Sequence, residues 1–435
     1  MTLNERLQNV AVLGAGGKMG SGISLLLARE MALQKLNPDN AGKSYRITLM
    51  DIDPAALDGL QNYLRRQAQK YAQKNAAALP GGSSETEFVD TMMSLLHPVT
   101  SLEKVGGTRM VFEAILEKLD LKVKVFNQLK STCAPDTYFF SNTSSIPLKE
   151  LDEQVGLDGR IIGFHFYNPP AVQRLVELII PERVQPELPA LSRELGKRLG
   201  KIIIPSNDVA GFIGNGHFMR DGLYGIHQAE VLAQEIGFVQ AVYAVNRISQ
   251  DFLVRPMGIF QLIDYVGLDI FQSILKIMNP HFPAEKLHSE LIDTLVTLGV
   301  KGGQFSDGSQ KDGFFKYESG KPVGVFDLES NGYREFAAES WPSEADQFLG
   351  PLPEAYAPWK ELLKAEDRAT ALNTYFASLT AGDTRGARLA TAYLKNSKQI
   401  GEALVSGGVA HSAEDVNGVL MNGFFHLYGP VNDFV

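Results

Sequence analysis

Short runs of β-branched and aromatic residues alternate with helical patterns over residues 9–206 of this 435-residue chain. The clearest runs, which we interpret as strands, cover residues 9–13, 46–50, 109–112, 137–140, 161–164 and 201–204. This alternation is typical of a parallel sheet covered by helices. After Asp208 the pattern becomes mostly helical, with a glycine-rich, aromatic interruption at 302–328. The sequence therefore predicts an α/β N-terminal domain followed by all-α structure.

The first predicted strand runs directly into a glycine-rich turn. The turn consists of Gly14, Ala15, Gly16, Gly17, Lys18, Met19 and Gly20, and an apolar helix follows it. Such a turn lets the backbone approach a pyrophosphate, whose charge the helix N-terminus stabilises. The spacing G-x-G-x-x-x-G is one residue longer than the usual fingerprint, so either Gly16 or Gly17 could make the close approach. We expect a Rossmann-type domain whose cofactor contacts include residues 14–19.

The second predicted strand is followed by an acidic residue, Asp51. A carboxylate at this place binds the ribose 2′-hydroxyl of NAD and repels the 2′-phosphate of NADP. Asp53 and Pro54 form a good helix start, so Asp51 is not needed as a cap. An insertion around residues 36–45 places Asp51 farther along the chain than usual. We expect NAD as the cofactor, although Lys18 argues for NADP.

The second half of the sequence contains a weak internal repeat. Residues 244–248 and Gly258 match residues 415–419 and Gly429 at a constant offset (429 − 258 = 171). Few identities support the match, and chance is the alternative explanation. We expect an NAD-binding domain with the catalytic residues at 1–206, a helical domain at 207–330 and a second helical unit, a degenerate repeat, at 331–435.

Bulk composition excludes several classes of function. The net charge of −9 argues against nucleic-acid or anionic-membrane binding, and no apolar run is long enough to span a membrane. The single cysteine, Cys133, can form neither an internal disulfide nor a cysteine metal site, and we interpret it as an inert thiol in a reducing compartment. The histidines show no metal-ligand spacing. With the first strand near residue 9 leaving no room for a signal peptide, we expect a cytoplasmic protein.

A second motif follows in the last part of the α/β region. His165-Phe166-Tyr167-Asn168-Pro169 precedes Glu177, which lies twelve residues after the histidine. This pattern resembles the signature of the 3-hydroxyacyl-CoA dehydrogenase family. Further segments resemble the family in order, namely residues 113–117 with Lys122, 141–145, 211–215, 256–258 and 264–269. The resemblance covers roughly residues 9–315 and implies NAD-dependent oxidation of the 3-hydroxyl of a fatty acyl-CoA, as in β-oxidation.

The chemistry of alcohol oxidation suits the residues of this motif. A neutral imidazole can take the hydroxyl proton near pH 7, and a carboxylate behind it fixes the tautomer and stabilises the imidazolium. The resemblance implies that His165 is this base and Glu177 its partner. It also implies that Ser144, Asn168 and Asn215 contact the substrate, with Ser144 and Asn215 around the reacting oxygen. The cofactor contacts that it implies beyond the glycine turn are Ala114, Glu117, Lys122 and Asn142.

Three departures from the family pattern leave the substrate open. Ala210 replaces a proline, Gly216 an arginine, and Gln173-Arg174 a Met-Lys pair. An NAD-dependent sugar-acid dehydrogenase of the L-gulonate type is one alternative, because such relatives share the His and Glu pattern. A non-catalytic NADH-binding or structural protein on the same scaffold is another. No hydratase or thiolase segment is present, so we do not expect a multifunctional chain.

The predicted repeat also bears on assembly. Related single-copy dehydrogenases pair through an apolar face of their helical domain. A second helical unit in the same chain could cover that face from within. We expect a monomer with an intrachain pseudo-dimer, with a homodimer as the alternative.

Overall fold

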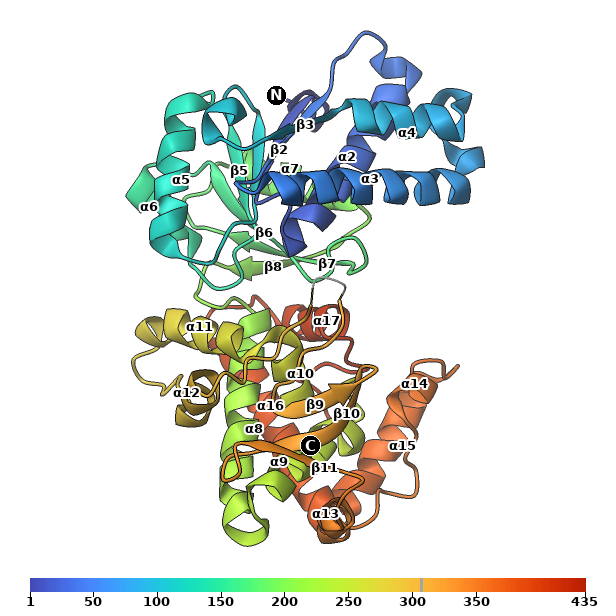
Figure 1. Cartoon of the computed structure of the whole chain (residues 1–435), viewed down its shortest axis with the longest axis vertical. Coiled ribbons are helices and arrows are strands. Elements are labelled where there is room, and N and C mark those ends of the chain that lie inside the picture. Colours follow the sequence, from blue (N-terminus) through green and yellow to red (C-terminus); the bar gives the residue numbers. More distant parts are fainter. Residues whose placement is uncertain (306–307) are drawn as a thin grey trace. The chain divides into compact units, whose positions relative to one another are not determined.

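The computed structural model describes residues 1–305 and 308–435, which form two compact units, Met1–Phe212 and Ile213–Val435 (Figure 1). The first unit ends just after β8 (Ile202–Asn207) and therefore extends six residues past the boundary expected at residue 206. The second unit holds most of the segment 207–330 together with all of 331–435. No described helix is long and apolar enough to cross a bilayer.

The first unit is built on an eight-stranded sheet with the order β3-β2-β1-β4-β5-β6-β7-β8. All neighbouring strands run parallel except β6 and β7, which pair antiparallel. The strands are β1 (Asn9–Leu13), β2 (Arg46–Met50), β3 (Leu96–Val99), β4 (Met110–Glu113), β5 (Tyr138–Ser141), β6 (Ile161–Phe166), β7 (Leu175–Ile180) and β8. The predicted Rossmann-type sheet is thereby confirmed, and β3 and β7 are additions to the six predicted strands. Pro98 weakens the strand pattern of β3, which suits the edge position that β3 occupies.

Helices cover this sheet on both faces. They are α1 (Leu3–Arg6), α2 (Lys18–Leu36), α3 (Pro54–Lys74), α4 (Glu85–Ser94), α5 (Leu119–Thr132), α6 (Leu148–Val155) and α7 (Glu187–Arg198). The Asp53 side chain accepts a hydrogen bond from Ala55 N at 2.9 Å, which confirms the predicted start of α3. Helices α3 and α4 pack against each other as a pair (Figure 1).

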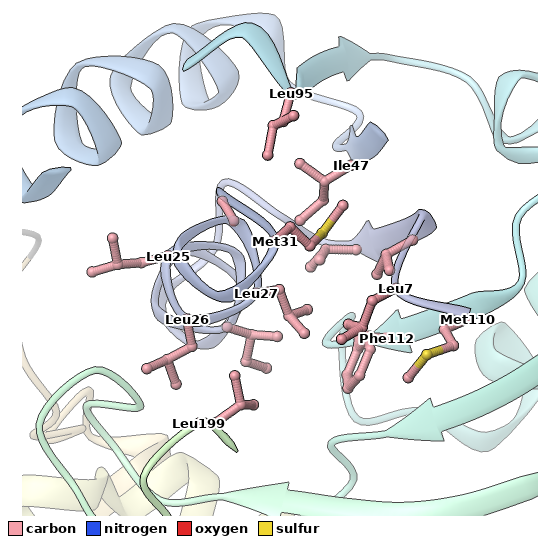
Figure 2. Close-up of a cluster of buried hydrophobic side chains, with 14 of the residues drawn as sticks. Leu7, Leu25, Leu26, Leu27, Met31, Ile47, Leu95, Met110, Phe112 and Leu199 are labelled. Carbon is pink, nitrogen blue, oxygen red and sulfur yellow. The ribbon is translucent and has the colours of Figure 1, made fainter. Parts of the chain in front are cut away.

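The core beneath the glycine turn forms around α2. Leu25, Leu26, Leu27 and Met31 of this helix are buried, and Figure 2 shows them among side chains from β2, β4 and the segment before β3. Helix α2 is buried on most of its circumference, because eleven of its nineteen residues are buried. A helix that is buried on most sides is held rigidly, so the turn at its N-terminus has a fixed position relative to the sheet.

The second unit is mostly helical, as predicted. Its helices are α8 (Gly214–Ile236), α9 (Phe238–Arg247), α10 (Ile259–Val266), α11 (Leu268–Met278), α12 (Glu290–Thr297), α13 (Trp341–Leu349), α14 (Trp359–Leu362), α15 (Arg368–Ala381), α16 (Arg385–Ser406) and α17 (Ala413–Gly423). The expectation of an all-α unit fails at one place, where β9 (Phe315–Glu318), β10 (Lys321–Asp327) and β11 (Gly332–Glu335) form an antiparallel sheet. Buried Asp264 on α10 anchors this sheet by accepting hydrogen bonds from the N–H groups of Phe314 (2.6 Å) and Phe315 (2.9 Å).

The two halves of the predicted repeat share one local geometry. A Cβ on Gly258 would lie 2.2 Å from Asn246 Oδ1, and a Cβ on Gly429 would lie 2.1 Å from Asn417 Oδ1. Helices α8 and α16 begin 171 residues apart as well, at residues 214 and 385, and pack against each other. The same close Asn–Gly contact therefore recurs at an offset of 171 residues.

Candidate active site

His165 and Glu177 face each other across the antiparallel pair β6 and β7. They are direct register partners, although twelve residues separate them in the chain. His165 Nδ1 lies 3.4 Å from Glu177 Oε2, and the glutamate is fully buried while the histidine is 8% exposed. The predicted pair is therefore brought together, with one ring nitrogen toward the carboxylate. The other nitrogen, Nε2, belongs to a group that can accept or donate a proton near neutral pH.

Tyr167 joins this pair, a residue that the motif contains but to which we assign no role from the sequence. Its hydroxyl donates a hydrogen bond to Glu177 Oε2 at 3.0 Å, and its ring lies 4.8 Å from the His165 ring. Burial, and then the charge of Glu177, raise the pKa of Tyr167 well above its usual value. The available sequence signal is its spacing, since residues i and i+2 of a strand face the same side.

The glycine turn lies between β1 and α2 and abuts the end of β4. Gly14 has φ of +69°, and a Cβ there would lie 2.5 Å from Ala114 O, so only glycine fits. Gly17 is the exposed N-cap of α2 and no side chain caps this helix end. Gly16 is more confined, because a Cβ on it would meet Ala56 Cβ at 2.6 Å. An uncapped helix N-terminus behind an exposed glycine suits an anionic group.

Asp51 lies directly after β2 and contacts the glycine turn. Its Oδ2 accepts a hydrogen bond from Gly16 N at 2.9 Å, and its Oδ1 accepts one from Asp53 N at 3.2 Å. The carboxylate is therefore held beside the turn, as expected for a residue that meets the adenosine ribose. Burial lowers the pKa of the neighbouring Lys18.

Lys122 lies in a buried ion-pair network behind the loop that follows β5. Its Nζ is 2.6 Å from Glu113 Oε1 and 3.1 Å from Glu117 Oε2, and the lysine is 1% exposed. Burial opposes the charge on Lys122, but the two carboxylates outweigh it and raise its pKa. Burial likewise opposes the charge on Glu117, whose pKa is nevertheless lowered by Lys122 and by donors from the loop.

The loop after β5 is built on these carboxylates. Glu117 Oε1 accepts hydrogen bonds from Thr143 Oγ1 (2.6 Å), Ser144 N (2.9 Å) and Ser145 Oγ (3.0 Å). Asn142 Oδ1 accepts from Phe166 N at 2.9 Å and so ties the end of β5 to the residue after His165. Ser144 is thus held at the same sheet edge as His165.

The loop between β6 and β7, residues 167–174, is also anchored. Lys201 Nζ donates to Pro170 O at 2.5 Å and to Gln173 O at 2.6 Å. Burial, with the nearby cations Arg29 and Arg174, lowers the pKa of Lys201 to about 8. The loop packs closely on α2, because a Cβ on Gly22 would lie 2.9 Å from the Pro170 ring. Asn168 is the second residue of this loop and lies three residues after His165 in the sequence.

The site residues that the sequence predicts in the first unit lie together at one edge of the sheet. The glycine turn, Asp51, Ala114, Asn142 and His165 lie at or after the carboxyl ends of β1, β2, β4, β5 and β6, respectively. Strand order reverses between β1 and β4, and ligands of open α/β sheets bind outside the carboxyl ends at such a reversal. The donor set and the open glycine backbone fit a dinucleotide. Asn215 belongs to the second unit, where it lies in the first turn of α8.

Two other kinds of chemistry find little support. Among residues 1–305 and 308–435, no group of three or more His, Cys, Asp and Glu side chains lies close enough to hold a metal ion. Burial raises the pKa of the Cys133 thiol, which suits its interpretation as unreactive.

Comparisons with known proteins agree with this geometry. The model of the 3-hydroxyacyl-CoA dehydrogenase NAD-binding domain matches residues 9–209, and that of the C-terminal domain of the same family matches residues 239–317. A probable 3-hydroxybutyryl-CoA dehydrogenase of Bacillus subtilis is 29% identical over 321 residues, which are 72% of this chain and 98% of the relative. A peroxisomal fatty acid beta-oxidation multifunctional protein of Oryza sativa is 28% identical over 319 residues, 73% of this chain but 39% of that protein.

A solved structure extends the likeness to nearly the whole chain. The crystal structure of 3-hydroxybutyryl-CoA dehydrogenase from Escherichia coli covers 98% of this chain and 90% of its own, with a TM-score of 0.66 and 21% identity. This likeness concerns the fold, and it includes the last hundred residues, which lie outside both family models.

Proposed function

Because the chain belongs to the 3-hydroxyacyl-CoA dehydrogenase family and is an NAD-dependent oxidoreductase, we propose that it oxidises L-3-hydroxyacyl-CoA to 3-ketoacyl-CoA with His165 as the general base. The observation that carries the proposal is the buried pair His165 and Glu177, opposed across β6 and β7 at the sheet edge that the dinucleotide fold uses.

The reaction divides between cofactor and protein. Bound NAD supplies the acceptor for the hydride that leaves C3 of the substrate. His165 Nε2 takes the proton of the 3-hydroxyl, so that the C3–O bond becomes a carbonyl. Glu177 stabilises the resulting imidazolium through Nδ1, which keeps the neutral ring in the tautomer with an accepting Nε2. Ser144 and Asn215 are proposed as hydrogen-bond partners of the reacting oxygen.

The cofactor contacts follow from the same edge. We assign the close approach to the pyrophosphate to Gly17, because Gly16 is already confined by Ala56 and Asp51. Ala15, Lys18 and Met19 complete the turn, and Asp51 would bind the ribose hydroxyls. Ala114, Glu117, Lys122 and Asn142 are proposed to border the nicotinamide half, with Glu117 and Lys122 acting through the loop that they hold.

The test is an initial-rate assay with short-, medium- and long-chain 3-ketoacyl-CoA substrates, measured as NADH oxidation. His165→Ala should lower turnover about 10²–10⁴-fold while NADH binding changes little, and Glu177→Gln should slow the step more mildly. His281→Ala, at an exposed histidine of the second unit, is the matched control. Near-normal turnover of His165→Ala would sink the mechanism. Turnover of a sugar acid of the L-gulonate type in place of acyl-CoA would assign the enzyme to that substrate class instead. No change in NADH absorbance with any substrate, despite tight NADH binding, would support a non-catalytic protein.

Assembly and location complete the proposal. We propose that residues 331–435 cover the helical face that single-copy relatives use for pairing, so that the chain is a monomer. We also propose that the protein is located in the cytoplasm. The packing of α8 on α16 and the repeated Asn–Gly contact support the monomer. Light scattering at micromolar concentration should report about 47.7 kDa, and a stable mass of twice that value would favour the homodimer instead.

A further inference from the structure

The hydroxyl of Tyr167 and the ring of His165 meet at one carboxylate oxygen. Tyr167 donates to Glu177 Oε2 at 3.0 Å, and His165 Nδ1 lies 3.4 Å from the same atom. We propose that Tyr167 is a positioning residue, whose hydroxyl holds the Glu177 carboxylate and moderates its pull on His165. The inference rests on the proposed function, because it extends the same catalytic pair.

The burial of Glu177 explains why a second donor matters. The residue is fully buried, and a carboxylate taken out of water needs hydrogen-bond donors to stay charged. The tyrosine can donate throughout the physiological range, because burial and the charge of Glu177 raise its pKa well above the usual value. Tyr167 is therefore a neutral donor, which binds the carboxylate without cancelling its charge.

The position of the hydroxyl is fixed from both sides. The Tyr167 ring lies at 39° to the His165 ring with centroids 4.8 Å apart, and the loop that follows is held by Lys201. His165 on β6 is an ionisable group in contact with the carboxylate, and the register partner of Glu177 on β8 is the aliphatic Ile204. The Phe212 ring also lies near the histidine, with ring centroids 6.4 Å apart.

Two consequences follow if the hydroxyl is removed. The carboxylate loses one of its restraints, so the imidazole is held less firmly and turnover falls. The carboxylate also has one donor fewer, so it attracts the imidazolium more strongly, and the base becomes protonated at higher pH. A residue that only fills space would produce neither a shift of the pH profile nor coupling to Glu177.

The experiment is the pH profile of kcat and kcat/KM for 3-hydroxybutyryl-CoA oxidation. Tyr167→Phe keeps the ring, and we expect kcat to fall about tenfold with KM within about twofold, while the acid limb moves up by about half a pH unit. Tyr63→Phe, on α3, is the matched control. In a Glu177→Gln background, Tyr167→Phe should cost no more than about twofold, because the partner of the hydroxyl is already changed.

The outcomes separate this inference from the proposed function. Wild-type kcat and an unmoved acid limb in Tyr167→Phe would overturn it, as would an equal loss in both backgrounds. Should Tyr167→Phe fail to fold, 3-fluorotyrosine at position 167 keeps the ring and strengthens the donor, so the acid limb should move to lower pH, and no movement would overturn the inference. Failure of the proposed function would be seen elsewhere, as near-normal turnover of His165→Ala.

Discussion

Replacing Lys122 with methionine should show how much the loop after β5 depends on one buried cation. The change keeps the length of the side chain and removes its charge. It leaves Glu113 and Glu117 without the ammonium that lies 2.6 and 3.1 Å from them. Removal of one partner from a buried ion pair costs about 3–5 kcal/mol, because the remaining charge is left uncompensated.

The structure places the expected loss at the lower end of that range. Glu113 keeps the Ser141 hydroxyl at 2.6 Å, and Glu117 keeps its donors from the loop. The Glu117 side chain is also 26% exposed, so water can partly compensate its charge. We therefore expect a loss of about 3 kcal/mol. For a unit of 212 residues this corresponds to a fall of about 6–12 °C in the melting temperature, at about 2–4 °C per kcal/mol.

The pH dependence of this loss identifies its cause. In the wild type the pKa of Glu117 is lowered, so the pair contributes stability above the unfolded value of 4.5 and loses it as pH falls through the lowered folded value. In the variant an unpaired buried carboxylate is relieved by protonation instead. The difference in unfolding free energy should be largest at pH 7–8 and shrink toward pH 4.5.

Calorimetry or urea unfolding at several pH values measures this difference. Lys124→Met is the matched control, since Lys124 is an exposed lysine on the same helix α5. A loss below about 1 kcal/mol, or a loss that does not change with pH, would refute the reasoning that Lys122 is the counter-charge of this network.

Four further substitutions test other parts of the two units. Asp51→Ser should erode the preference for NADH over NADPH in initial-rate assays, and a wild type that uses both equally would contradict the assignment. Gly22→Ala should lower turnover, because the added Cβ would push on the loop between β6 and β7. Gly59→Ala has open space around the added Cβ and should stabilise α3 by about 1 kcal/mol in urea unfolding. Gly429→Ala should cost about 1–3 kcal/mol by displacing the Asn417 amide, and an unchanged melting curve would argue against this contact.

Sequence reasoning worked best where local chemistry and burial point the same way. The strands at residues 9–13 and 46–50 are observed with their predicted bounds, because both are buried β-rich runs with clear breaks. The start of α3 is set by an Asp cap and a proline in its first turn, which act locally whatever the tertiary context. These elements fix the glycine turn and Asp51, and with them the NAD-binding end of the site.

Elements that form only through pairing with distant segments are harder to predict from the sequence. The segment Leu175–Ile180 becomes a strand by inserting between β6, to which it is antiparallel, and β8, to which it is parallel. The sequence pattern does not specify this placement. The strands after residue 314 depend on buried Asp264, fifty residues earlier in the chain. Local pattern cannot show such long-range anchors, since the residues that form them are ordinary in their own segments.

A motif residue can also support a site by holding other residues in place, without touching the ligand. Lys122 is an example. Its ammonium has three N–H donors, and two acceptors within the chain, Glu113 and Glu117, lie within 3.1 Å. At 1% exposure it has little surface left for a cofactor. Glu117 in turn accepts hydrogen bonds from Thr143 and Ser144 of the loop through one of its two carboxylate oxygens. The segment that resembles a cofactor border therefore also holds the loop after β5, which carries Ser144. If Ser144 contacts the substrate as proposed, a change in either carboxylate should alter cofactor and substrate binding together.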